Sequence, residues 1–136
     1  MMDKLVRLFV AVVFFVVLLF PYTNGQSTNE VCGIVDGASV VAQDAKNTFL
    51  GKITNEFASD SIFNEFGTYG SEFSSESIWN EFGTFGSEFS SYSPHNAFTS
   101  TPPMIVKNRK IVGYLTTNKS IESSISPNLL KALCYA

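Results

Sequence analysis

A tandem repeat is the feature that most constrains how this chain can fold. Residues 64–79 read NEFGTYGSEFSSESIW and residues 80–95 read NEFGTFGSEFSSYSPH, with a partial copy at 55–63 and the stub NAF at 96–98. Two full copies rarely form a stable repeat protein alone, so we expect the flanking segments to complete the core. Within the repeats, a small polar residue, then Glu or Ala, then Phe recurs at spacings of 9, 7, 9, 7 and 9, at Phe57, Phe66, Phe73, Phe82, Phe89 and Phe98.

Each copy carries the signals of a short helix followed by a glycine turn. In residues 74–83, SSESIWNEFG, a serine can cap the helix, Ile78, Trp79 and Phe82 share one face, and Gly83 can end it. The same pattern at 59–67 predicts a second helix of about two turns. A β-solenoid coil and a disordered tract are the alternatives, and the eleven aromatic residues among the 44 of residues 55–98 argue against disorder.

The repeated aromatic residues have two interpretations. We expect the six spaced phenylalanines and Trp79 to form the core of the repeats, because each buried aromatic side chain stabilises a small domain by a few kcal/mol. The alternative is an exposed platform that contacts a sugar or a partner surface.

The N-terminus predicts a signal peptide at residues 1–25 and a secreted domain at residues 26–136. Lys4 and Arg7 precede thirteen apolar residues at 8–20, and Thr23-Asn24-Gly25 offers small residues for cleavage before Gln26. A membrane anchor is the alternative, but thirteen helical residues cover only about 20 Å of a hydrocarbon core about 30 Å thick.

The two cysteines, Cys32 and Cys134, lie close to the ends of the predicted secreted domain. Since secretion passes through an oxidising compartment, we expect them to form a disulfide that joins those ends. Free thiols or an intermolecular bridge are the alternatives.

The flanks of the repeats predict the rest of a small single α+β domain. Residues 31–35 and 38–41 are apolar and flank Asp36-Gly37, which indicates a hairpin after a disordered lead-in at 26–29, and residues 48–54 resemble a strand. Residues 42–47 form either one helical turn or a loop. Residues 104–117 predict a β-hairpin that turns at Asn108-Arg109, and Ser126-Pro127 begins a helix at 126–134.

Little in the sequence indicates catalysis. His95 is the only histidine, so one chain cannot form a multi-histidine metal site. A Ser-His-Asp triad would have to use His95 itself. Gly67, Gly70, Gly83 and Gly86 are turn residues of the repeat rather than a phosphate loop. A hydrolase that uses acidic residues is the least favoured function, and a cleft around Asp60 or His95 would be needed to support one.

Two weaker sites are predicted. Oxygen ligands from Glu65, Glu72, Glu81 and Glu88, with Asn64 and Asn80, suit Ca²⁺, although the same acids can simply keep a phenylalanine-rich repeat soluble. Asn118-Lys119-Ser120 is an N-glycosylation sequon. No organic cofactor is indicated.

The charges are segregated along the chain. Residues 55–98 hold seven acids and no lysine or arginine, whereas residues 104–136 hold five bases and one acid. The acidic block argues against nucleic acid as a partner and predicts attraction to the basic hairpin, within one chain or between two.

The repeat, followed by TSTPPMIV and IVGYLTTNK, resembles a group of small, mostly uncharacterised secreted bacterial proteins. These carry tandem N-x-[FY]-G-x-[FY]-G-S-x-[FY]-S-S-x-S-I-x units and a Pro-Pro-β-hairpin tail, and the similarity covers residues 49–119. Their repeats more often have Tyr and Lys where this chain has Phe and Glu, and their hairpin often turns at Asp-Gly. The resemblance implies no catalytic residue. The sequence as a whole indicates a secreted, extracellular, non-enzymatic binding or structural module. Its expected partner is a second copy, a cell surface or a glycan. A Ca²⁺- or carbohydrate-binding repeat protein is the alternative.

Overall fold

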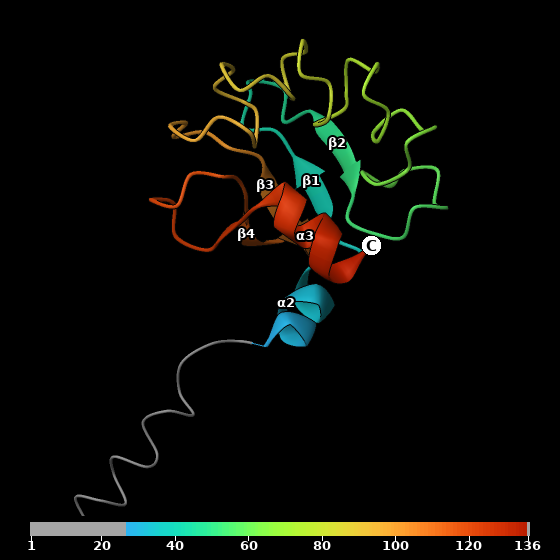
Figure 1. The fold of residues 1–136 in the computed structure, drawn as a ribbon. Helices are drawn as coiled ribbons and strands as arrows, with labels where there is room; N and C mark the ends of the chain where they lie inside the picture. Colours follow the sequence, from blue (N-terminus) through green and yellow to red (C-terminus); the bar gives the residue numbers. More distant parts are fainter. Residues whose placement is uncertain (1–26, 136) are drawn as a thin grey trace, which may run out of the picture.

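A computed structural model describes residues 27–135, which form one five-stranded sheet, two short helices and a long series of turns (Figure 1). The predicted signal peptide at 1–25 lies outside the described residues. The sheet has the order β2-β1-β3-β4-β5, so the α+β class is confirmed. In chain order the elements are α2 (Thr28–Val35), β1 (Ser39–Val41), β2 (Phe49–Lys52), β3 (Met104–Lys107), β4 (Lys110–Leu115), β5 (Ser124–Ile125) and α3 (Pro127–Cys134).

β1, which precedes the repeats, pairs at the centre of the sheet with β3, which follows them. β1 pairs antiparallel with both β2 and β3, and β3 pairs antiparallel with β4, while β4 and the short β5 are parallel. The β3–β4 hairpin turns at Asn108 and Arg109, whose φ angles of 53° and 63° match the left-handed pair that a two-residue hairpin requires. The predicted hairpin is therefore confirmed, as are the strand within 48–54 and the C-terminal helix.

The N-terminal hairpin predicted at 31–41 is wrong, because its first half is α2. Ser27 caps this helix by accepting a hydrogen bond from the N–H of Glu30, which lies in the first turn. Ser-x-x-Glu is a capping box, and this local signal outweighs the β-branched residues Val31 and Val35. The predicted disordered lead-in is wrong for Thr28 and Asn29, which are the first residues of the helix.

A disulfide between Cys32 and Cys134 joins α2 to α3, with a Cα–Cα distance of 5.6 Å. Beside it, the hydroxyl of Tyr135 donates a hydrogen bond of 2.7 Å to Asp36, and the Tyr135 ring stacks on Phe63. Burial and this carboxylate both raise the pKa of Tyr135. Within residues 27–135, neither helix is long and apolar enough to cross a membrane.

The core is shared between the sheet and the repeats. Most of its buried side chains come from the strands and the residues next to them, such as Val40, Leu50 and Ile105, but Ile62, Phe63 and Ile78 belong to the repeats. This agrees with the expectation that the flanks complete the core.

Residues 53–103, all of which are described, contain no helix. The helices predicted at 59–67 and 74–83 are therefore wrong, while the predicted glycine turns are present. In Figure 1 this segment runs from β2 to β3 as a succession of loops that fan out in an arc around the sheet.

Candidate binding surface on the repeat segment

The repeat segment, residues 55–98, is built from turns that advance three residues at a time. The N–H of every third residue donates to the carbonyl three positions earlier, as from Gly67 to Asn64 at 3.0 Å and from Asn80 to Ser77 at 3.3 Å. Gly70 and Gly86 are each inserted as one additional residue, so that a copy consists of five triplets and one glycine.

Side chains at the first position of the triplets reinforce these turns. Asn64 Oδ1 accepts the N–H of Phe66 at 3.0 Å, and Ser77 Oγ accepts the N–H of Trp79 at 3.1 Å. Asn and Ser side chains compete with helical hydrogen bonds in this way, which is why the helix signals are overridden. The amide of Asn64 also donates to the carbonyl of Ala58 at 3.1 Å, and that of Asn80 donates to Ser74 in the equivalent bond.

The six regularly spaced phenylalanines point into solvent, and the prediction that they form the core is wrong. Their exposed fractions lie between 86% and 98%. Each occupies the third position of a triplet, and its N–H donates to the Asn or Ser two residues earlier. The turns therefore hold six apolar side chains outward on a hydrogen-bonded frame: Phe57, Phe66, Phe73, Phe82, Phe89 and Phe98.

A different triplet of each copy faces the sheet. Ser61, Ser77 and Ser93 are fully buried. The residues two positions later, Phe63, Trp79 and His95, form a row with ring centroids 6.4 Å and 5.5 Å apart.

Trp79 anchors the centre of this row. Its Nε1–H donates to the Ile62 carbonyl at 2.6 Å, and the ring packs against the core, so its predicted core role is retained. His95 is half-buried, and burial lowers its pKa, while a backbone hydrogen bond to Ile78 acts in the opposite direction.

Gly70 and Gly86 allow the chain to pass close to the start of each copy. A Cβ at Gly86 would lie 2.1 Å from the Asn80 carbonyl oxygen, and one at Gly70 would lie 2.1 Å from that of Asn64. Neither glycine has positive φ, so the requirement is space rather than backbone conformation.

Two equivalent grooves result, one in each copy. Groove 1 has a volume of about 450 Å³ and groove 2 of about 720 Å³. Trp79 lines both, and most of the other walls correspond at a separation of sixteen residues. Ile62 and Lys131 line groove 1 alone, and Ser87 lines groove 2 alone. Groove 1 is lined by Phe63, Glu65, Phe66, Glu72, Phe73 and Trp79. Groove 2 is lined by Trp79, Glu81, Phe82, Glu88, Phe89 and His95.

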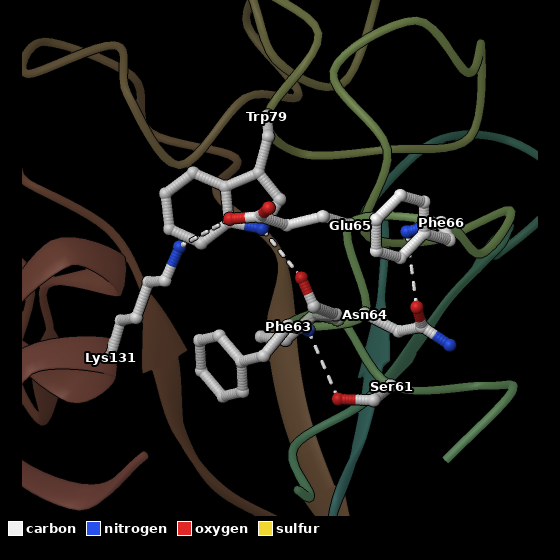
Figure 2. A network of polar contacts seen from close by, with 8 residues as sticks. Ser61, Phe63, Asn64, Glu65, Phe66, Trp79 and Lys131 are labelled. Atoms are coloured by element: carbon white, nitrogen blue, oxygen red, sulfur yellow. Dashed lines mark hydrogen bonds and ion pairs between the residues drawn. The ribbon is translucent and has the colours of Figure 1, made fainter. Parts of the chain in front are cut away.

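Groove 1 is also lined by a lysine from outside the repeats. Lys131 of α3 places Nζ 3.7 Å from Glu65 Oε1 and 5.4 Å from the centre of the Trp79 ring (Figure 2). A carboxylate and an aromatic face together stabilise an ammonium group, so groove 1 is already a cation site within the chain.

The four glutamates of the Ca²⁺ hypothesis are divided between the grooves. Glu65 and Glu72 line groove 1, and Glu81 and Glu88 line groove 2. Within residues 27–135, no three acidic, histidine or cysteine side chains come close enough together to hold a metal ion. Asn64 and Asn80 use their side chains to hold the turns.

The remaining predicted residues lie elsewhere. Asp60 forms an ion pair with Lys52 at 3.7 Å, and His95 lies in groove 2 beside Trp79. Asn118, the predicted glycosylation site, is partly buried, and its amide donates to the Thr99 carbonyl at 2.8 Å.

The fold and the surface define a small α+β protein in which an arc of turns, carrying aromatic and acidic side chains, packs against one sheet. Comparison with protein-family models, curated proteins and solved structures finds no match.

The three-residue turns that carry the phenylalanines were missed, although the sequence contains a signal for them. The phenylalanine spacing of nine residues equals three triplets, and the spacing of seven equals two triplets and the inserted glycine. A three-residue period with Asn or Ser in first position indicates consecutive side-chain-capped turns rather than helices.

Proposed function

We propose that this chain is a secreted, non-enzymatic binding module whose repeat segment presents exposed phenylalanines and glutamates to an extracellular partner. The observation that carries the proposal is the exposure of the six phenylalanines, at 86–98%, on turns whose backbone is hydrogen-bonded.

The exposure is costly unless the side chains have a partner. Burying one phenylalanine contributes about 1.5–3 kcal/mol, so leaving six in water forgoes a large part of what a small domain can gain. Exposed apolar groups with a polar rim are typical of interaction sites, and here Glu65, Glu72, Glu81 and Glu88 supply the rim.

Secretion is supported by the predicted signal peptide and by the Cys32–Cys134 disulfide, since such bonds persist in oxidising compartments. The resemblance to secreted repeat proteins supports the same location. A binding role is favoured over hydrolysis because Asp60 and His95 are engaged with Lys52 and Trp79 respectively.

The test replaces four groove phenylalanines, Phe66, Phe73, Phe82 and Phe89, by serine. Because these side chains are exposed, the variant should melt within a few degrees of the wild type. Retention of both proteins is measured on two surfaces, an insoluble polysaccharide and immobilised poly-lysine. We expect the wild type to be retained on at least one of them and the variant to be lost. Equal retention of the two proteins, or no retention of the wild type on either surface, would overturn the proposal.

A further inference from the structure

The two grooves share most of their wall positions but differ in one wall residue that comes from outside the repeats. In groove 1 the ammonium of Lys131 lies against Glu65 and the Trp79 ring (Figure 2). This lysine belongs to α3 and not to the repeat, so it meets the glutamate and the ring of groove 1 as a side chain from another part of the chain would.

Groove 2 repeats the glutamates and phenylalanines of these walls without such a lysine, while Trp79 stands in the place of Phe63 and His95 in the place of Trp79. Glu81 and Glu88 stand where Glu65 and Glu72 stand in groove 1, and Phe82 and Phe89 replace Phe66 and Phe73. Of the described residues that line it, none is a lysine or arginine, and its volume of about 720 Å³ exceeds the 450 Å³ of groove 1.

We propose that groove 2 binds the lysine or arginine side chain of a basic partner polypeptide, in the manner in which groove 1 binds Lys131. This inference rests on the proposed function and names the ligand class of the same surface. The glutamates attract the charge, and the aromatic faces contact both the charge and the apolar stem of the side chain.

A primary ammonium or guanidinium fits groove 2 better than a quaternary ammonium does. Two carboxylates accept hydrogen bonds, which only an N–H donor can supply. The occupant of groove 1 is itself a primary ammonium.

The test measures binding of acetyl-tetralysine amide to the full secreted domain by calorimetry at low salt. The variant Glu81→Gln/Glu88→Gln should weaken binding about tenfold, since two rim charges are lost. The matched control Glu76→Gln/Glu122→Gln removes the same charge outside both grooves and should stay within about twofold of the wild type.

A second variant tests the equivalence of the grooves. Lys131→Met keeps an apolar stem but removes the ammonium, so it should open groove 1 and raise the stoichiometry from one peptide to two. Thermal melts of every variant establish that it is folded.

Three outcomes would overturn the inference: no binding of the peptide, equal weakening by the groove and control variants, or unchanged stoichiometry in a folded Lys131→Met protein. Binding to phosphatidylcholine vesicles without binding to the peptide would also overturn it, because the ligand would then be a quaternary ammonium. The polysaccharide surface separates these failures from failure of the proposed function, because retention of the wild type there and loss of the phenylalanine variant would leave the proposed function standing.

Discussion

The substitution Gly86→Ala should strongly destabilise the fold although it adds a single methyl group at a turn. The new Cβ would lie 2.1 Å from the carbonyl oxygen of Asn80 and 2.8 Å from its nitrogen. Contacts of Cβ with other atoms rarely fall below 3.0 Å, so the backbone must separate by about 1 Å.

The magnitude follows from what holds Asn80 in place. Its carbonyl accepts the N–H of Gly83 at 3.0 Å, and its own N–H donates to Ser77 at 3.3 Å. Losing these two bonds costs about 1 kcal/mol each, and overpacking adds about 1–3 kcal/mol. Alanine also reduces the conformational entropy of the unfolded chain, which stabilises the fold by about 0.4–1 kcal/mol. The free energy of unfolding should therefore decrease by roughly 3 kcal/mol in total.

The assay is thermal unfolding followed by the fluorescence of Trp79, the only tryptophan. A loss of 3 kcal/mol lowers the melting temperature of a domain this size by roughly 13 °C. Gly70→Ala should behave alike, because its Cβ meets the Asn64 oxygen at the same 2.1 Å.

Gly33→Ala is the matched control, because a Cβ there meets nothing within 4 Å and the residue lies inside α2. In a helix, alanine is favoured over glycine by about 0.5–1 kcal/mol, so this variant should be slightly more stable. A Gly86→Ala protein that melts within 2 °C of the wild type would refute the close approach between the inserted glycine and the start of its copy.

Four further predictions follow from other parts of the structure. Trp79→Ala should lose about 3–5 kcal/mol because it removes core packing and the bond to Ile62, whereas Glu81→Gln should stay within about 0.5 kcal/mol; equal urea midpoints would contradict this. Replacing both Cys32 and Cys134 by serine opens a loop that spans 102 residues and should cost about 4 kcal/mol in guanidinium unfolding, and an unchanged midpoint would count against a bond that joins α2 to α3. Burial lowers the pKa of His95, so the unfolded state binds this proton more readily than the folded state does. The free energy of unfolding should therefore be highest above pH 6.5 and decrease as the pH falls below that value. The His95→Gln variant should show a smaller decrease. If the basic hairpin contacts the acidic repeats of a second copy, charge reversal at Lys107, Arg109 and Lys110 should weaken salt-sensitive self-association in sedimentation. If the contact lies within one chain, the same reversal should instead lower the melting temperature. No change in either measurement would show that the charge segregation has no energetic role.

The sequence by itself determined those features that depend on neighbours along the chain. Asn108-Arg109 between two β-rich runs predicts the hairpin, and Ser126-Pro127 predicts the start of α3, because turns and caps are decided within a few residues. The spacing of the phenylalanines likewise contains the three-residue period of the turns. Cys32 and Cys134 predicted the disulfide because they are the only two cysteines.

Only the tertiary structure decided which side of the repeat faces inward. Phe63 and Phe66 each hold the third position of a triplet and each donate their N–H to the first, yet Phe63 is 3% exposed and Phe66 is 98% exposed. The difference arises because the sheet lies on one side of the arc only, and a local pattern carries no information about where a distant strand will be. The cation site has the same origin, since Glu65 and Lys131 are far apart in sequence and meet only when the disulfide-linked α3 packs beside the repeats.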